Sequence, residues 1–406
     1  MPVASVQPVV TGIIPQIADY AGDLTSWRQH LHAHPELDLA CHATADFVVA
    51  RLKEFGITMI HRGLAETGVI ALIDGQGDGP TIGLRADMDA LPIHEETSAA
   101  WISKRPGVMH ACGHDGHTTM LLGAARYLAA HRNFRGRVAL IFQPGEELSG
   151  GGRIMVEAGV FDRFAISEVY ALHTLPGKAL GSFHTRSGPF LASVDDFRFD
   201  VQGQGGHVGY PDLCRNPITQ LAPLIKGVSK IESELSTKHG PGVVACTVAQ
   251  AGEATNVVPD SAMLTGSVRT QSAAFRVEAE ARLSQLAETT DMPCRFQYAK
   301  YYPPLVNHMA QTTFAAKVAA TLADVDADSA PHNVAEDFSY MLETCPGCFL
   351  FIGQGPGPSL HSATFDFDDS IAAIGASFFA RLVEARSRPN WTERAYLGVV
   401  KNNSGT

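Results

Sequence analysis

The chain has 406 residues, of which 45% are hydrophobic and 18% charged, and its formal net charge is −11 at pH 7. This composition is ordinary for a globular protein, and the length is sufficient for two domains. The acidic balance, without any basic run, argues against nucleic acid or an anionic membrane surface as a partner.

The amino terminus and the cysteines bear on the cellular compartment. The first residues lack the positive and apolar regions of a secretory signal, and no apolar run approaches the ~18 residues that a membrane helix needs. The seven cysteines are scattered and odd in number, which argues against a disulfide framework. We therefore expect a cytoplasmic protein.

Helical and strand patterns alternate in the first part of the chain. Apolar residues at helical spacing predict helices near 13–34 and over 43–55, and two apolar β-runs follow at 68–73 and 81–84. The glycine-rich segment between the two runs lacks the Lys-Ser/Thr ending of a phosphate loop and opens no helix. We interpret it as a hairpin turn.

Polar residues that could bind a ligand follow several of the later predicted strands. Strands are predicted at 137–142, 169–172 and 349–352; the second ends at His173, and a Gly/Pro loop after the third leads to His361. In open α/β sheets, ligands bind outside the carboxyl ends of the strands, and buried parallel strands read as continuous apolar runs. The sequence therefore predicts an α/β domain with a mostly parallel central sheet flanked by helices.

The pattern changes in the middle of the chain. Between 190 and 301 the order is strand, helix, strand, strand, helix, strand, which is typical of a split βαβ, ferredoxin-like α+β domain. We interpret it as a lid inserted into the catalytic domain. The predicted organisation is a catalytic domain in two parts, 1–189 and 302–388, the inserted lid domain at 190–301, and a polar carboxyl-terminal tail at 389–406.

The densest chemical signal is the segment 109–117, in which three histidines, a cysteine and an aspartate fall within nine residues. Imidazole and thiolate are ligands that a borderline-soft divalent metal prefers. Together with strand-end residues they give a predicted ligand set: Cys112, His114, Glu147, His173 and His361. Five protein ligands and a shared water suit two adjacent metals, because one metal normally needs three or four. The alternative is a polar loop with chance histidines.

Three acidic residues complete the predicted site. Glu146 and Glu147 are adjacent, so we expect one of them, Glu147, to bind metal and the other, Glu146, to act as the general base. Asp89 follows a strand end and could orient a ligating imidazole from behind. Two solvated loop carboxylates are the alternative for the glutamate pair.

Two further motifs are interpreted as structural. Cys345 and Cys348 form a single C-x-x-C before an apolar strand, which is a weak zinc signal without a second pair, so we expect buried packing. His30, His32 and His34 alternate along a predicted helix, where this spacing places the imidazoles on different faces. Capping or packing is a better explanation for them than metal binding.

The order of these motifs resembles the metal-dependent amidohydrolases of the aminoacylase, hippurate hydrolase and indoleacetyl-amino-acid hydrolase family, distantly akin to zinc carboxypeptidases. The matching segments cover nearly the whole chain: 27–37, Asp87 with Asp89, 110–117, 143–147, 172–173, 205–207, 256–260, 335–338 and 361–367. Residues 98–101 and 208–212 differ from the usual pattern of that family, at positions where substrate would be gripped.

The resemblance implies hydrolysis of an N-acyl amino acid (N-acetyl, benzoyl or arylacetyl) to a carboxylic acid and a free amino acid. It implies two divalent ions (zinc, manganese, cobalt or nickel), held by the ligand set above, with Glu146 as base. It places His207 of the lid at the scissile carbonyl, Asn256 and Arg269 at the substrate, and a second copy of the chain at the lid, forming a homodimer or higher oligomer. The alternatives are a dipeptidase or carboxypeptidase of the same family, or a catalytically inactive metal-binding relative.

Overall fold

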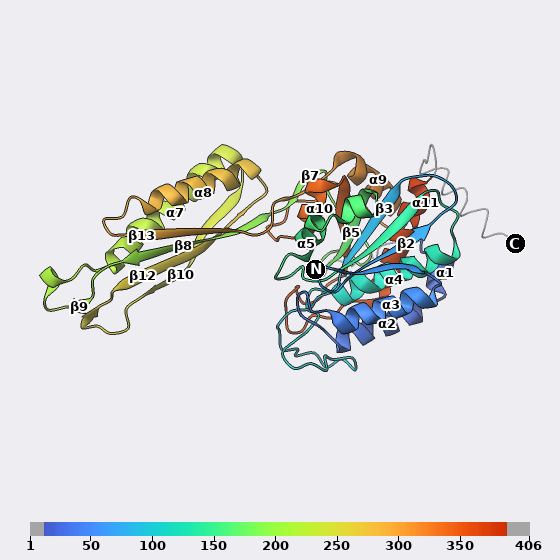
Figure 1. Cartoon of the computed structure of the whole chain (residues 1–406), viewed down its shortest axis with the longest axis horizontal. Coiled ribbons are helices and arrows are strands. Elements are labelled where there is room, and N and C mark those ends of the chain that lie inside the picture. The colour runs from blue at the N-terminus through green and yellow to red at the C-terminus, as the bar shows by residue number, and fades with distance from the viewer. Residues whose placement is uncertain (1–11, 388–406) are drawn as a thin grey trace, which may run out of the picture. The chain divides into compact units, whose positions relative to one another are not determined.

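The computed structural model describes residues 12–387 and divides them into two compact units (Figure 1). The first unit holds the described residues up to Gly188, Asn307–Ala330, and those from Tyr340 on. The second unit holds Pro189–Val306 and Pro331–Ser339. The predicted tail at 389–406 lies outside the described residues. None of the helices within the described part of the chain is long and apolar enough to cross a membrane.

The first unit is built on an eight-stranded sheet with the order β1-β2-β4-β3-β5-β16-β6-β15. The strands are β1 (Met59–Leu64), β2 (Gly68–Asp74), β3 (Thr81–Asp87), β4 (Arg137–Gln143), β5 (Ile166–Leu175), β6 (Phe183–His184), β15 (Val325–Asp326) and β16 (Gly347–Gly353). The central strands β4, β3, β5 and β16 run parallel, whereas β1 and β2 form an antiparallel edge. The predicted fold class, with its mostly parallel sheet, is confirmed.

One local prediction is wrong. Strands β2 and β3 do not form a hairpin, because β4 lies between them, antiparallel to β2 and parallel to β3. Strand β4 is buried along almost its whole length, so pairing on both edges satisfies its backbone groups where water cannot reach them. The glycine-rich segment after β2 therefore connects strands that are not neighbours.

Helices cover both faces of this sheet (Figure 1). They are α1 (Pro15–Ala18), α2 (Ala21–Ala33), α3 (His42–Glu54), α4 (His114–Ala130), α5 (Gly151–Glu157), α6 (Val160–Arg163), α9 (Met309–Ala319), α10 (Phe338–Thr344) and α11 (Ala372–Arg386), with a 3-10 turn at Asp369–Ile371. Helix α4 is buried over most of its length and packs against α2, α11 and the sheet. Its amino-terminal turn, which begins at His114, is therefore fixed by its surroundings.

The second unit has a four-stranded antiparallel sheet with the order β10-β12-β8-β13 and two helices, α7 and α8, packed on it. The elements follow the chain as β8 (Ser193–Gln202), α7 (Ile218–His239), β10 (Gly242–Ala251), β12 (Ser261–Thr270), α8 (Ala273–Ala287) and β13 (Cys294–Lys300). This is the predicted strand–helix–strand–strand–helix–strand order. The unit also carries a small pair, β9 (Gly206–His207) with β11 (Val257–Val258), and a 3-10 turn at Pro211–Leu213. Short strands β7 (Gly188–Leu191) and β14 (Leu305–Asn307) stand where the chain passes from one unit to the other.

Candidate metal centre

The candidate site lies at the carboxyl ends of the central parallel strands. Asp89 follows β3, the pair Glu146 and Glu147 follows β4, and His173 stands near the end of β5. The amino terminus of α4 reaches the same edge and presents His114 as its first residue. Because parallel strands end together at one edge of a sheet, residues that are far apart in the sequence converge there.

The structure brings the five predicted ligands together. The sulfur of Cys112 lies 3.4 Å from Nε2 of His173. Oε1 of Glu147 lies 3.3 Å from Nε2 of His361 and 3.8 Å from Nε2 of His114. Ligand atoms of Cys112, Glu147 and His361 all lie within 4.8 Å of one another. Four of the five side chains are at most a tenth exposed, whereas the side chain of His361 is 52% exposed.

Two backbone features place these donors. Gly113 takes the left-handed conformation, with φ of 88°, at the amino-terminal cap of α4, and this turn separates Cys112 from His114. His361 also has a positive φ, of 63°, and its N–H donates to the carbonyl of Ala111 over 2.8 Å. The loop that carries His361 is therefore tied to the segment that carries Cys112.

Asp89 holds the glutamate pair and one imidazole. Its carboxylate accepts the backbone N–H groups of Glu146 and Glu147, each over 3.1 Å. The same carboxylate lies 3.4 Å from Nδ1 of His114. Asp89 is therefore placed to orient His114, as predicted, and it also fixes the glutamate loop, which the sequence did not predict. Glu146 is 7% exposed, and its carboxylate lies within 4.8 Å of ligand atoms of His114 and Glu147.

Burial and neighbouring charges shift the protonation of the donors. Burial, with the nearby carboxylates of Glu147 and Glu146, raises the pKa of the Cys112 thiol well above its usual value. Burial opposes charge on His114, but Asp87 and Asp89 more than offset it and raise its pKa to about 10. Without metal at neutral pH, Cys112 is therefore a thiol, and His114 is an imidazolium with a proton on each ring nitrogen. A cation that binds here must displace these protons.

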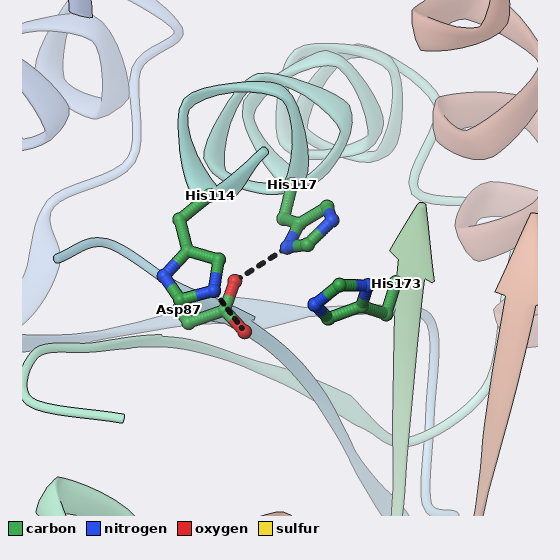
Figure 2. A group of neighbouring side chains, drawn as sticks. All are labelled: Asp87, His114, His117 and His173. Carbon is green, nitrogen blue, oxygen red and sulfur yellow. Dashed lines mark hydrogen bonds and ion pairs between the residues drawn. The ribbon is translucent and has the colours of Figure 1, made fainter. Parts of the chain in front are cut away.

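Figure 2 shows two residues that the sequence reasoning did not assign, Asp87 and His117, next to His114 and His173. Oδ1 of Asp87 lies 2.6 Å from Nδ1 of His117, and Oδ2 accepts a hydrogen bond of 2.8 Å from Arg85. All are buried. The available signal was the three-residue spacing of His117 from His114 at the start of a helix, which places both side chains on one face.

A buried ion network lies beneath the site. Arg28 of α2 is fully buried, and its guanidinium donates to Asp369 over 2.6 and 2.9 Å and to Asp366 over 2.9 Å. Trp101 lies under the same guanidinium, 4.9 Å from its carbon, and donates to Asp366 over 3.2 Å. Trp101 belongs to the segment that differs from the usual family pattern. Its indole is held by Arg28 of α2 and by Asp366, and Asp366 lies in the loop after His361.

His32 extends this network from the next turn of α2. Its Nδ1 lies 2.8 Å from Asp115 of α4, and its Nε2 lies 3.3 Å from Glu95. Burial would lower the pKa of His32, but these two carboxylates raise it to about 9. His30 and His34 are exposed. The three histidines thus occupy different environments, and His32 packs as an ion-paired core residue.

Of the three predicted lid residues, His207 and Asn256 are neighbours, whereas Arg269 lies apart from them. His207 is exposed on β9, next to the backbone of Asn256, whose carbonyl accepts the N–H of Val208 over 3.1 Å. Arg269 stands near the carboxyl end of β12, where it pairs with Val194. Its Nε donates to the hydroxyl of Ser267 over 3.4 Å. Eight residues of extended strand separate Arg269 from the start of β12, on the order of 26 Å at ~3.3 Å per residue.

The C-x-x-C motif is part of the core. Cys345 is 3% exposed and Cys348 is fully buried at the start of β16, and both are free thiols. Burial raises the pKa of Cys345 to about 12 and that of Cys348 to about 11. Inert buried thiols of this kind agree with the packing interpretation.

Known proteins resemble this chain over most of its length. The profile of peptidase family M20/M25/M40 matches residues 83–385. A hippurate hydrolase from Campylobacter jejuni subsp. jejuni serotype O:2 is 34% identical over 377 residues, covering 91% of this chain and 98% of that protein. An N-acetylcysteine deacetylase from Bacillus subtilis is 35% identical, covering 88% of this chain and 95% of the relative. A solved structure described as a dinuclear metal binding peptidase of the M20 family, also from Bacillus subtilis, has a TM-score of 0.78 at 32% identity and covers 90% of this chain and 98% of that one.

Proposed function

Because this chain belongs to peptidase family M20/M25/M40, we propose that it is a two-metal amidohydrolase that cleaves the amide bond of N-acyl amino acids. The products are a carboxylic acid and a free amino acid. The observation that carries the proposal is the convergence of five metal-type donors and a buried second glutamate at the end of one sheet.

The donors suit divalent ions by two criteria. The first is polar atoms that lack hydrogen bonds: among the described residues, both ring nitrogens of His114 and Oε1 of Glu147 are buried and make only ion-pair contacts of 3.3–3.8 Å. Such atoms are costly unless a cation or water meets them. The second is the donor chemistry, since sulfur, imidazole nitrogen and carboxylate oxygen together suit zinc, manganese, cobalt or nickel.

The donors fall into two overlapping sets, which is why we propose two ions. Cys112 and His173 lie 3.4 Å apart, and ring nitrogens of His173 and His114 lie within 4.8 Å of each other. Cys112 also belongs to the set with Glu147 and His361. Cys112 therefore lies between the two sets, where its thiolate would be shared.

Bound ions of this kind lower the pKa of water and polarise a carbonyl group. Glu146 is the residue we assign to move the proton: it accepts the proton of the attacking water and returns it to the leaving amine nitrogen. Asp89 holds the backbone of Glu146 and so fixes where its carboxylate can reach. We assign Glu147 to the metal donors. Burial raises its pKa, but the contact with His361 and the charge of His114 outweigh burial and lower the pKa of Glu147.

The lid residues complete the proposed reaction. We assign His207 to the carbonyl oxygen, Arg269 to the carboxylate of the amino acid, and Asn256 to the substrate. His207 and Arg269 are too far apart in one lid to touch the same small substrate. We therefore propose a homodimer in which two lids serve each site, one supplying His207 and the other Arg269. Exposed apolar side chains beside His207 fit contact with a second copy: Val208, Tyr210 and Leu213 are 50%, 65% and 69% exposed.

Hydrolysis of a substrate panel tests the proposed reaction. Purified protein supplied with Mn²⁺ or Zn²⁺ is assayed on hippurate, N-acetylcysteine, N-acetylmethionine and arylacetyl amino acids, with dipeptides that carry a free α-amine as the comparison. Preference for the N-acylated compounds supports the proposal. Preference for dipeptides supports a peptidase, and metal binding without turnover of any compound supports an inactive relative.

The assignment of Arg269 has its own test. Replacement by alanine removes a charge-assisted hydrogen bond, so kcat/KM on an N-acyl amino acid should fall by about tenfold to a hundredfold. The matched substrate is the corresponding N-acyl amino acid amide, whose kcat/KM should change little. An equal loss on both compounds would place Arg269 outside carboxylate recognition.

A further inference from the structure

We propose that His117 is a positioning residue that fixes the imidazole of His173 through the backbone of Thr174, starting from the ion pair of Asp87 with Arg85. The inference rests on the proposed function, in which His173 holds a metal ion. It excludes His117 itself from the ligands, although its ring lies in the same buried group as Asp87, His114 and His173 (Figure 2).

Both ring nitrogens of His117 are already engaged. The backbone N–H of Thr174 donates to Nε2 over 2.9 Å, so Nε2 carries a lone pair. The ring proton of the neutral imidazole is then on Nδ1, which donates to Oδ1 of Asp87 over 2.6 Å. No nitrogen of His117 can bind a cation unless one of these two buried hydrogen bonds is lost.

Thr174 passes this constraint to the next side chain. Its carbonyl accepts the Nδ1–H of His173 over 2.7 Å. That bond places the ring proton of His173 on Nδ1 and leaves Nε2 with its lone pair toward Cys112, whose sulfur is 3.4 Å away. The side chain of Thr174 is fixed as well, since its hydroxyl donates to Gln354 over 2.8 Å. A ligating imidazole held in one tautomer by its other nitrogen is the usual requirement of a metal site.

The sheet explains why a histidine is needed at this position. The pairing of β3 with β5 ends where Arg85 lies opposite Ala171, and Thr174 stands three residues further along β5. The N–H of Thr174 is fully buried there, and its hydrogen bond goes to His117. A buried backbone donor without an acceptor is unfavourable by about 1–3 kcal/mol. His117 therefore completes the end of the strand that carries His173.

We call this chain of contacts, which leads from Asp87 through His117 to His173, the relay. Its first residues are held in place by several hydrogen bonds. Asp87 is the last residue of β3 and 1% exposed, and its Oδ2 accepts from Arg85 over 2.8 Å. Nε of Arg85 donates in turn to Gln143, the last residue of β4, over 2.9 Å. The backbone carbonyl of Asp87 accepts the hydroxyl of Thr118 over 2.8 Å, which ties the strand end to the helix of His117. The position of His117 is thus set by two strands and one helix.

Two amide substitutions at His117 separate the positioning role from a general packing role. In His117→Gln the side-chain oxygen reaches as far as Nε2 did and can still accept the N–H of Thr174. In His117→Asn the shorter amide can donate to Asp87 but cannot reach Thr174. His173→Ala is the control that removes the proposed ligand itself. The measurements are bound metal per chain, affinity for Zn²⁺ against a chelator, and the visible spectrum of the Co²⁺-loaded protein, which reports thiolate and imidazole ligation.

We expect His117→Asn to bind Zn²⁺ about 10–100-fold more weakly than wild type and to shift the Co²⁺ spectrum. Loss of a residue that orients a metal ligand usually weakens metal binding by this factor. His117→Gln keeps the acceptor for Thr174 but loses the bond to Asp87, so it should fall between wild type and His117→Asn in both measurements. The relay is wrong if His117→Asn matches wild type, or if His117→Gln loses metal as completely as His173→Ala. The second comparison decides the matter even if His117→Asn does not fold. If His173→Ala itself leaves metal content and affinity unchanged, the ligand assignment of the proposed function fails instead.

Discussion

The two units hold their candidate residues in opposite ways. In the first unit, Asp89, His117 and His173 are buried, and each takes part in two or more hydrogen bonds or ion pairs. In the second unit, His207 is exposed, and its ring accepts one hydrogen bond, from the backbone of Gly209 over 2.9 Å. The proposed metal donors are thus placed by folding, whereas the role that we propose for His207 needs a partner that only substrate binding supplies.

The largest expected effect on turnover comes from substitutions in the first unit. Glu146→Gln removes the proposed base and leaves the metal donors in place, so turnover should fall by about 10²–10⁴-fold with metal content unchanged. Glu147→Gln should lose metal as well as turnover. Turnover is measured on the best substrate of the panel, and metal by elemental analysis. Metal loss in Glu146→Gln with retention in Glu147→Gln would reverse the two roles.

The second unit should show a smaller loss of a different kind. His207→Ala removes a donor to the carbonyl oxygen, so turnover should fall by about 10²–10³-fold with metal content intact. Near wild-type kinetics of His207→Ala would show that His207 and its surroundings serve only packing or dimerisation.

Mixing the two variants sharpens the comparison. If His207 acts across a dimer, subunits of His207→Ala and Glu146→Gln refolded together form one site with both groups intact. Activity of the mixture should then rise far above that of either variant. A mixture no more active than its parents would place His207 in the lid of its own subunit.

The buried ion network predicts the smallest effect, on stability. Asp115 and Glu95 raise the folded-state pKa of His32 from 6.5 to about 9. The contribution of His32 to the free energy of unfolding is then complete below pH 6.5, and it is lost as the pH rises through about 9. Its size is at most about 3–4 kcal/mol, because the pKa rises from 6.5 to about 9 and one pKa unit corresponds to about 1.4 kcal/mol.

Unfolding of wild type and His32→Gln in denaturant, followed from pH 6 to 9.5, measures this contribution. Wild type should lose its advantage over the variant as the pH rises across that interval. Curves that stay parallel would show that His32 is not charged in the folded protein.

The sequence predicted which side chains of the first unit lie together because the signals for them are local. Cys112 and His114 stand two residues apart, Glu147 follows β4, and His173 lies near the carboxyl end of β5, so the strand-end rule was enough to bring them together. The spacing of His117 from His114 places both on one helix face, but the bond of His117 to Asp87 also depends on which way two side chains point. The hairpin that was wrongly predicted after β2 has a similar origin, because the residue pattern of a strand does not show which strand pairs with it.

The second unit was predicted as a topology but not as a set of positions. The order of its elements follows from periodicity. The separation of Arg269 from His207 follows from the register of β12, in which Arg269 lies opposite Val194 and Ser261 opposite Gln202. Register is set by pairing between distant segments. The sequence left open whether His207 acts within its own subunit or across a dimer, because it does not give this distance.

Metal content of wild type and Cys112→Ala tests the central claim most directly. The account predicts two ions per chain in wild type and fewer in Cys112→Ala, because the thiolate lies between both donor sets. Binding to wild type should also release protons, since Cys112 and His114 are protonated without metal, and the affinity should weaken as the pH falls. Elemental analysis gives the stoichiometry, and calorimetry in buffers of different ionisation enthalpy gives the protons. Unchanged stoichiometry and activity in Cys112→Ala would contradict the account.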